Sequence, residues 1–426
     1  MPSSATSPSV TPPSAASASA ASASVTPPSV APRPPRIAVV GAGPGGLTCA
    51  RVLQRHGVAV TVHDLDASAT ARDQGGSLDM HPDTGQHALR AAGLWDAFHP
   101  LSRPEGQQIR VADRHGHLLL DAAPPENGNG GGDDVGSGAG TGDGADARPE
   151  IDRGRLRRLL LDALAPGTVR WGQRLERAEP LGGGGHRLYF ADGSTTEADL
   201  VIGADGAWSR VRPLVSDARP GYTGVTVVEA ELHDADHRHP ELAAFTGNGM
   251  MMALDAGQGV IAQRNGGGRI RIHLGLRTAE DWHRTAGVDL ADPAAVRTAL
   301  LARFSGWGAP LRAFLHATDT GYVNRPLYAL PVPHLWRRTP GVTLLGDAAH
   351  LMSPIGGMGA NLAMRDGADL ARALLDHPSV DAAVASYEEF RRPRSTAAAA
   401  GAAAGLADAF SADGAAHVLA HLSGQG

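Results

Sequence analysis

The segment Ile37–Asp66 reads IAVVGAGPGGLTCARVLQRHGVAVTVHDLD and decides the fold of the surrounding chain. A short apolar strand runs into a GxGxxG turn, and an apolar-periodic helix and a second strand follow the turn. Gly41 permits the tight turn, Gly43 lets the backbone approach a pyrophosphate, and Gly46 lets the helix pack closely on the sheet. The N-terminus of that helix supplies free N–H donors and the positive end of the helix dipole.

An acid ends the second strand at the distance that ribose recognition requires. Asp64 follows the turn by roughly 20 residues, and its carboxylate can accept hydrogen bonds from ribose hydroxyls. A GxGxxG sequence alone is weak, because an ordinary glycine-rich loop would also produce it. Here the strand, the helix and the acid stand in register with the turn. The segment therefore predicts a dinucleotide-binding domain of Rossmann-like α/β fold.

Two later segments favour FAD over NAD as the dinucleotide. Both are apolar strands that run into a turn: LVIGADGAWSRVR at Leu200–Arg212 and VTLLGDAAH at Val342–His350. A glycine-rich turn that opens a helix, LMSPIGGMGANLAM, follows at Leu351–Met364. Either Asp-Gly or Gly-Asp alone marks only a turn. Together with the first motif, they resemble the three fingerprints of the class A flavoprotein monooxygenases, the single-component FAD-dependent aromatic hydroxylases, from about residue 37 to about residue 375.

The resemblance implies FAD contacts in the third motif. Asp347, which follows Gly346, would hold ribityl or ribose hydroxyls, because a carboxylate at a strand end can accept hydrogen bonds from several of them. The next glycines would leave bare N–H groups where a helix begins near Ala360, which suits negative charge on the N1–C2=O side of a reduced flavin. The turn and helix positions that the resemblance assigns to the cofactor are Pro354, Gly356, Gly357, Gly359 and Asn361.

The second motif allows two interpretations of its acid. Asp205 and Gly206 are similar to residues that contribute to both FAD and NADPH handling in this family. Asp205 can also be a helix N-cap, because Ser209 and Arg210 follow at capping distance. Both interpretations stay open at the level of sequence.

A basic helix is a further matching element. The segment Glu150–Leu164, EIDRGRLRRLLLDAL, has leucines at helical spacing. Arg153 stands at its N-terminal end, where the family places an arginine over the flavin region, and a guanidinium suits contact to phosphate or ring carbonyls. We expect Arg155, Arg157 and Arg158 on a solvated face.

One segment resembles a particular branch of the family. GGSLDMHPDTGQHALRAAGL, residues 75–94, looks like the tetracycline-inactivating enzymes and their polyketide-hydroxylase relatives. The resemblance places Asp79 and His81 near the isoalloxazine edge. The stretch Phe245–Leu254, FTGNGMMMAL, departs from it, with three methionines where drug-inactivating relatives have polar or basic ligand contacts. This departure argues against tetracycline itself as the substrate.

The segment between the second and third motifs predicts an antiparallel sheet that roofs the substrate pocket. Alternating runs indicate strands at residues 225–232, 250–254, 259–264 and 269–276, and helices at 293–304 and 309–316. No residue is assigned as a catalytic base. The side chains expected at the substrate, each of which could equally be an ordinary core or sheet residue, are Met250, Met252, Gln263, Arg271 and His273.

The domain organisation follows from these motifs and from composition. We expect a discontinuous FAD-binding domain (36–112, 148–212 and 325–378), a substrate-binding sheet domain (213–324) and C-terminal helices (379–426). Residues 1–35 are rich in Ser, Ala and Pro and predict a disordered tail, with neither a signal peptide nor a membrane helix. Residues 126–147 predict a low-complexity loop.

Composition excludes several classes of protein. The net charge of −6 argues against nucleic acid as a partner. The single cysteine, Cys49, rules out a disulfide within the chain and suits a cytoplasmic location. With a single cysteine the chain has no CxxC pair, and we expect no metal. We also expect a monomer that does not bind membranes.

The resemblance implies a monooxygenase reaction. NADPH, or NADH, would reduce FAD, O2 would add at the flavin C4a atom, and the resulting hydroperoxide would pass one oxygen atom to an aromatic, polyketide or tetracycline-like substrate. Two alternatives stay open. One is a flavin-dependent reductase of the same fold, and the other is a flavoprotein that sequesters a drug or pigment without turning it over.

Overall fold

A parallel sheet of five strands carries the three sequence motifs in the computed structural model of the chain. β1 (Ile37–Val40) lies at its centre, between β11 (Leu200–Gly203) and β2 (Val60–His63). The edge strands are β17 (Val342–Leu344), beside β11, and β7 (Val169–Arg170), beside β2. All pairings are parallel, so the carboxyl ends of the three strands that precede the motifs meet at one edge. The predicted Rossmann-like α/β fold is confirmed.

Different layers cover the two faces of this sheet. One face packs on α1 (Pro44–Arg55), α4 (Arg153–Asp162) and α11 (Met358–Asp376). The other face packs on a three-stranded antiparallel sheet. The strands of this smaller sheet are β8 (Leu175–Pro180), β9 (His186–Phe190) and β10 (Thr195–Ala198). Alternate side chains of β1 enter each core, as the period of a strand requires. The domain therefore has three layers, the small sheet, the parallel sheet and the helices, in a ββα arrangement.

A seven-stranded sheet forms the second large layer. Its order is β16–β12–β15–β14–β13–β4–β5, and its pairings are antiparallel except that of β13 with β4. Its strands are β4 (Ile109–Ala112), β5 (Leu118–Ala122), β12 (Gly221–Leu232), β13 (Met250–Asp255), β14 (Gln258–Asn265), β15 (Arg269–Arg277) and β16 (Val323–Ala329). The four strands that the sequence predicts between residues 225 and 276 are all present.

Strand pairing moves two segments out of the domains that the sequence pattern assigned to them. β4 falls in residues 36–112, which we expected in the FAD-binding domain, but it pairs with β13 in the large sheet. Most of β16 falls in residues 325–378, also expected there, but it pairs with β12. The pairing of β4 with β13 joins strands that are far apart in the sequence. A local sequence pattern does not predict such a pairing.

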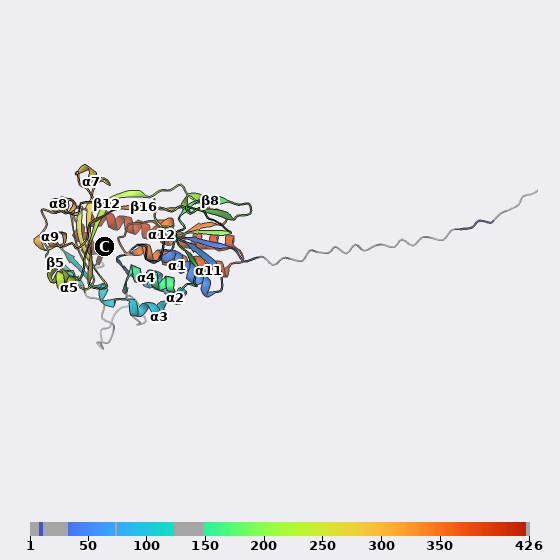
Figure 1. Ribbon diagram of the computed structural model, residues 1–426, viewed down its shortest axis with the longest axis horizontal. Coiled ribbons are helices and arrows are strands. Elements are labelled where there is room, and N and C mark those ends of the chain that lie inside the picture. Colours follow the sequence, from blue (N-terminus) through green and yellow to red (C-terminus); the bar gives the residue numbers. More distant parts are fainter. Residues whose placement is uncertain (1–7, 12–32, 73–74, 123–147, 423–426) are drawn as a thin grey trace, which may run out of the picture. The chain divides into compact units, whose positions relative to one another are not determined.

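Helices α6 (Pro240–Thr246), α8 (Pro293–Arg303) and α9 (Ala309–His316) cover one face of the large sheet. Even-numbered side chains of β12 pack with these helices in one buried cluster. Figure 1 shows α8 and α9 on the outer side of the sheet, away from α1, α4 and α11. The odd-numbered side chains of β12 therefore face the FAD-binding layers.

Short elements and two C-terminal helices complete the fold. The remaining strands and helices are β3 (Ser77–Asp79), β6 (Glu150–Asp152), α2 (His87–Ala92), α3 (Trp95–Phe98), α5 (Ala235–Arg238), α7 (Trp282–Thr285), α10 (Asp347–His350), α12 (Val380–Ala409) and α13 (Gly414–Leu422). The structure describes residues 8–11, 33–72, 75–122 and 148–422. The predicted loop at 126–147 and most of the predicted tail at 1–35 lie outside these ranges.

Helices α1 and α11 cross in close backbone contact. A Cβ atom built on Gly367 of α11 would lie 2.3 Å from the carbonyl oxygen of Gly45 and 3.0 Å from the backbone nitrogen of Cys49 in α1. Backbone atoms within a helix cannot move aside as a flexible side chain can. Glycine at this position therefore sets the distance between the helix that follows the first motif and the helix that follows the third.

We expect Gly367→Ala to destabilise the protein by about 1–3 kcal/mol or more, because it overpacks this crossing. Gly401→Ala is the matched control. Gly401 is an exposed residue of α12 with no atom within 4 Å of a built Cβ, so alanine there should stabilise the helix by up to about 1 kcal/mol. Thermal unfolding of the two variants checks this. Equal melting temperatures would contradict the close crossing.

Candidate active site

The three motif turns meet at the carboxyl edge of the parallel sheet. Gly41, at φ +110°, ends β1, and a Cβ atom on it would lie 2.3 Å from the carbonyl oxygen of Ala204, just before the second motif's acid. Gly346, at φ +59°, ends the third strand, and a Cβ atom on it would lie 2.9 Å from the Cβ of Ala363 in α11. These close approaches need glycine, and they place the motifs side by side.

The GxGxxG turn leaves room for a ligand in front of it. A Cβ atom on Gly43 would meet nothing within 4 Å, whereas one on Gly46 would lie 2.2 Å from the carbonyl oxygen of Gly41. Pro44 opens α1 and has no N–H, so the first-turn donors come from Gly45 and Gly46. Open space at Gly43 beside a helix N-terminus matches the approach of a diphosphate.

Asp64 braces the first motif. One carboxylate oxygen accepts a hydrogen bond from the backbone N–H of Ala42 at 2.6 Å, and the other accepts one from the N–H of Asp66 at 2.8 Å. Asp64 is buried, yet each oxygen keeps a second lone pair. The carboxylate fixes the turn and can still accept from a ribose hydroxyl, which stays a prediction.

The sequence pattern was wrong about Arg157. We expected it on a solvated face, but it is buried beneath the first motif. Its guanidinium donates to the carbonyl oxygens of Ala42 at 3.1 Å and Ala69 at 2.8 Å, and to Asp66 at 3.3 Å. The sequence spacing does indicate burial of Arg157, because this residue follows a buried leucine and falls within the apolar stripe of α4.

Arg153 stands between the FAD-binding layers and the large sheet. It is exposed to solvent while protein surrounds it on most sides, as expected for a side chain that lines an open cavity. Burial lowers the pKa of its guanidinium, the charges of Asp347 and Glu229 raise it, and that of Arg271 lowers it. Arg153 therefore lies close enough to the third motif's acid and to charged residues of β12 and β15 for their charges to act on it.

The carboxylate of Asp347 has capacity for a ligand. It begins α10 and is half-buried, and no described residue donates a hydrogen bond to it. A Cβ atom on Gly359 would lie 3.9 Å from its Oδ1 atom, so the glycine-rich turn passes close by. Gly356 faces open space, and Pro354 is exposed beside it. An unsatisfied carboxylate beside a bare turn is the arrangement that cofactor hydroxyls and a flavin ring require.

Asn361 is a brace within this turn. It is completely buried, and its Oδ1 atom accepts hydrogen bonds from the N–H groups of His81 at 3.0 Å and Gly85 at 3.1 Å. Its Nδ2 atom donates to the carbonyl oxygens of Asp79 at 2.7 Å and Gly357 at 3.2 Å. These contacts use its amide to join the 75–94 segment to α11. Direct contact of Asn361 with the cofactor stays a prediction.

Asp79 lies against the start of α11. Its carboxylate accepts a hydrogen bond from Nε2 of His81 at 2.7 Å. A Cβ atom on Gly357, at φ +66°, would come within 2.6 Å of its Oδ1 atom. The Asp79–His81 pair and the N-terminus of α11 therefore form one wall of the cavity.

Asp205 braces the turn after β11 and caps no helix, since the next helical segment, the short 3-10 helix Arg212–Leu214, has Val211 as its N-cap. Its carboxylate accepts hydrogen bonds from the Ser209 hydroxyl and the Arg210 N–H, both at 2.6 Å. Burial raises its pKa, and these hydrogen bonds oppose that effect. Gly206 adopts φ +77° and faces open space. The second motif thus uses its acid to shape its own turn, and its role toward NADPH stays a prediction.

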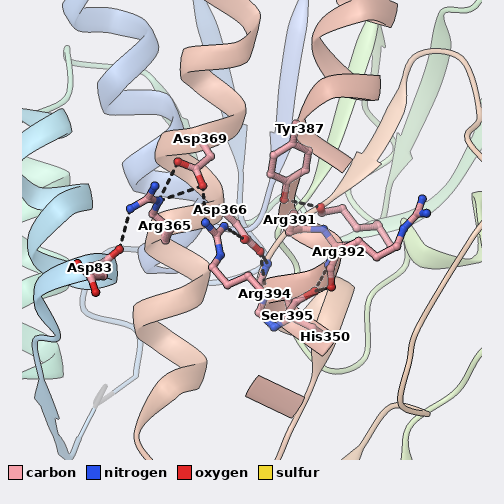
Figure 2. A network of polar contacts seen from close by, with 12 residues as sticks. Asp83, His350, Arg365, Asp366, Asp369, Tyr387, Arg391, Arg392, Arg394 and Ser395 are labelled. Atoms are coloured by element: carbon pink, nitrogen blue, oxygen red, sulfur yellow. Dashed lines mark hydrogen bonds and ion pairs between the residues drawn. The ribbon is translucent and has the colours of Figure 1, made fainter. Parts of the chain in front are cut away.

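A buried ionic network holds the third motif in place, as Figure 2 shows. Asp366 of α11 is fully buried and accepts hydrogen bonds from the Gly346 N–H at 3.2 Å, from His350 Nε2 at 2.7 Å and from Arg394 of α12 at 3.0 Å. Arg394 also donates to Asp369 at 2.8 Å. Burial raises the pKa of Asp366, but the charges of His350, Arg391 and Arg394 outweigh burial and hold it below its usual value.

Removing this carboxylate should unfold or loosen the cofactor site. Asp366→Ala leaves His350 without its acceptor and Arg394 with Asp369 alone, and breaking a buried pair typically costs about 3–5 kcal/mol. The control is Asp376→Ala on the same helix, which removes only an exposed ion pair with Arg372, worth less than about 1 kcal/mol. Denaturant unfolding of both variants tests this, and equal losses would contradict the role of the network.

Glu150 is a buried acid behind the cavity. It stands directly opposite Asp79 in the β3–β6 pair and accepts a hydrogen bond from the Ser77 hydroxyl. Burial, opposed by the Ser77 hydrogen bond and reinforced by the charge of Asp79, raises its pKa to about 7. Arg103 lowers the pKa and Asp152 raises it. Glu150 therefore takes up a proton in the folded protein that it loses in the unfolded chain.

The higher pKa of Glu150 in the folded protein than in the unfolded chain determines how stability changes with pH. Stability is full below pH 4.5, the ordinary pKa of Glu150, and falls as the pH rises through about 7, by about 3 kcal/mol in total. Glu150→Gln should remove this loss and stabilise the protein relative to wild type only toward high pH. The control is Glu176→Gln at an exposed site. The measurement is the free energy of unfolding at acidic and alkaline pH. If the Glu150 variant kept the wild-type dependence of this free energy on pH, the assignment would be contradicted.

The structure brings the predicted substrate residues together on one sheet face. Glu231, Arg271, Gln263 and Met250 are successive cross-strand partners from β12 to β13. The adjacent row on the same face consists of Glu229, His273, Ile261 and Met252. This is the face turned toward Arg153 and α11. Sequence reasoning missed the two glutamates, although both alternate with apolar residues along the predicted strand.

The arrangement fits FAD. The bare first-turn donors of α1 and the space before Gly43 would take the diphosphate, and Asp347 would take ribityl or ribose hydroxyls. Arg153 would contact phosphate or ring carbonyls. The described residues contain no group of three or more His, Cys, Asp or Glu side chains that could hold a metal ion. No helix in the same part of the chain is long and apolar enough to span a bilayer. The fold and site define a dinucleotide-binding flavoprotein with a second, substrate-facing sheet.

Comparison with known proteins identifies the family. The model of the FAD binding domain family matches residues 36–281 and 334–402, which is more than half of the chain. The chain belongs to this family. It is 30% identical to 6-hydroxynicotinate 3-monooxygenase of Pseudomonas fluorescens over 85% of this chain and 89% of that protein. It is 29% identical to monooxygenase asqM of Emericella nidulans, over 80% of this chain and 83% of that protein.

Solved structures share the fold. The Klebsiella pneumoniae HpxO complex with FAD and uric acid has a TM-score of 0.73 at 23% identity, and covers 91% of this chain and 92% of its own. Tetracycline destructase Tet(55) has a TM-score of 0.69 at 19% identity, and covers 92% of this chain and 96% of its own. The chain is an FAD-dependent monooxygenase with NAD(P)H as its co-substrate, and the resemblance seen in the sequence is confirmed.

Proposed function

We propose that this monooxygenase hydroxylates a planar, one- or two-ring aromatic or heteroaromatic compound that carries a ring hydroxyl group. In the overall reaction the substrate, O2, NAD(P)H and one proton give hydroxylated substrate, water and NAD(P)⁺. FAD, when bound, would carry the two electrons of NAD(P)H to oxygen. The residues of the chain bind the substrate, orient it and exclude water.

The observation that carries this proposal is the composition of one row across the large sheet. His273, Ile261 and Met252 stand on three adjacent strands, about 5 Å apart, so the row spans about 10 Å. All three are only half-buried, although a second layer covers the sheet face. Apolar side chains left partly exposed under a covering layer line a cavity. An imidazole at one end and a thioether at the other suit a flat ring with one polar edge.

Side chains flank this row on both sides along β15. Arg271 lies against the residues just before β3, because a Cβ atom on Gly75 would overlap its guanidinium. Phe410 fills the space over Gly275, where a Cβ atom would lie 2.4 Å from its ring. A row about 10 Å long favours one or two rings over the four linked rings of tetracycline.

The names of several relatives support this size and chemistry. They specify 6-hydroxynicotinate, 3-amino-4-hydroxybenzoate and urate as substrates. The first two carry a ring hydroxyl, and all three are small aromatic or heteroaromatic compounds.

Turnover of defined compounds tests the proposal. The FAD-loaded enzyme is incubated with NADPH and, separately, 4-hydroxybenzoate, 6-hydroxynicotinate, a hydroxyquinoline, urate or tetracycline, while oxygen uptake and product mass are followed. We expect a one- or two-ring hydroxylated compound to accelerate NADPH oxidation and to gain one oxygen atom. Hydroxylation of tetracycline alone, or reduction without oxygen uptake, would contradict the proposal. A Met252→Arg variant should lose the activity, and Met251→Leu, on the opposite sheet face, should keep it.

A further inference from the structure

We propose that His273, held by Glu229, accepts the hydroxyl proton of the substrate and so activates the ring toward oxygen transfer. This inference rests on the proposed function and names the residue that performs one of its steps. It is carried by the placement of the two side chains on the cavity face of the sheet.

Glu229 and His273 are direct cross-strand partners. They stand opposite each other on β12 and β15, and Nδ1 of the imidazole lies 3.7 Å from Oε1 of the carboxylate. With its N–H at Nδ1 facing the carboxylate, the ring presents Nε2 as a free acceptor. No described residue makes a hydrogen bond to that nitrogen. The carboxylate lies beyond hydrogen-bond distance, but its negative charge favours the N–H at Nδ1 and stabilises the imidazolium that forms when Nε2 accepts a proton.

The other charged groups around the cavity are unsuited to this role. Glu231 accepts a bidentate interaction from Arg271; burial raises its pKa, but Arg271 outweighs burial and keeps it below its usual value. Glu229 accepts from Arg325 at 3.3 Å and lies 3.9 Å from Arg271, so its charge is shared by two cations. Arginine does not release its proton in proteins. His273 is therefore the one side chain of these two rows able to take a proton at neutral pH.

The surroundings keep His273 neutral. Burial lowers the pKa of His273 below 6.5, Glu229 and Glu231 raise it, and Arg271 lowers it. Arg153 acts on the same glutamate and arginine from the other side of the cavity. A neutral imidazole with a depressed pKa is ready to accept a proton at physiological pH, and protonation below that pKa abolishes the function.

The proton transfer is balanced within the site. The O–H bond of the substrate breaks, its electron pair stays on the oxygen, and the proton forms an N–H bond at Nε2. Glu229 stabilises the resulting imidazolium by its negative charge. After oxygen transfer the proton returns to the product oxygen, so His273 is regenerated.

The test is the pH profile of kcat/KM for the panel compound that wild-type enzyme hydroxylates fastest. His273→Gln should lower kcat by roughly 100- to 10,000-fold and remove the acidic limb of the profile, which in wild type lies below pH 6.5. Glu229→Gln should lower kcat less and shift the acidic limb to lower pH, because it removes the charge that stabilises the imidazolium. His316→Gln, at an exposed site on α9, is the control and should match wild type.

Chemical rescue separates proton transfer from a structural role. Imidazole added to His273→Ala should restore part of the turnover, and more so as the pH rises and imidazole becomes neutral. A His273→Gln enzyme within threefold of wild type (about 0.7 kcal/mol in barrier), or a pH-independent loss that imidazole does not rescue, would overturn the assignment and leave the proposed function standing. Failure of wild-type enzyme to hydroxylate any panel compound would overturn both.

Discussion

A carboxylate with no access to water is tolerated only where donors surround it, and Asp366 meets this condition at the centre of the FAD-binding half. Its donors come from the turn after β17, from α10 and from α12. The position of Gly346 is therefore tied to two helices at once. Because β17 lies beside β11 and β11 beside β1, this one anchor fixes the third motif relative to the other two. The rest of the site depends on that register.

The candidate site lies between the parallel sheet and the large sheet, which present different chemical groups. The parallel sheet presents backbone donors and an open carboxylate at its carboxyl edge, which suits a charged dinucleotide. The large sheet presents alternating charged and apolar side chains, which suit a flat organic molecule. Arg153 is common to both, since the charges of Asp347 and Glu229 both act on it. The charge of Arg153 therefore interacts with acids of both the cofactor region and the substrate region.

Much of the fold and of the candidate site could be predicted from the sequence, for a physical reason. The turns at Gly41 and Gly346 require backbone conformations that favour glycine, so their positions could be predicted. The substrate residues share one face because side chains alternate along a strand, and His273 follows Arg271 by two positions. Local patterns held a signal for the burial of Arg157 and for the contacts of Asp205, but not for the partners of Arg157 or for the pairing of β4 with β13. These partners depend on which distant segment packs against the residue or strand. The local sequence of a charged side chain is the same whether that side chain is buried or exposed.

Flavin content of the purified protein tests the central claim most directly. Protein heated to release its cofactor is analysed for FAD by chromatography, for wild type and for Asp347→Ala, with folding of both checked by circular dichroism. The account predicts one FAD per wild-type chain and a large loss of FAD from a folded Asp347→Ala variant. Wild-type protein without FAD, or a variant that retains it fully, would contradict the claim that the three strand ends form one flavin site.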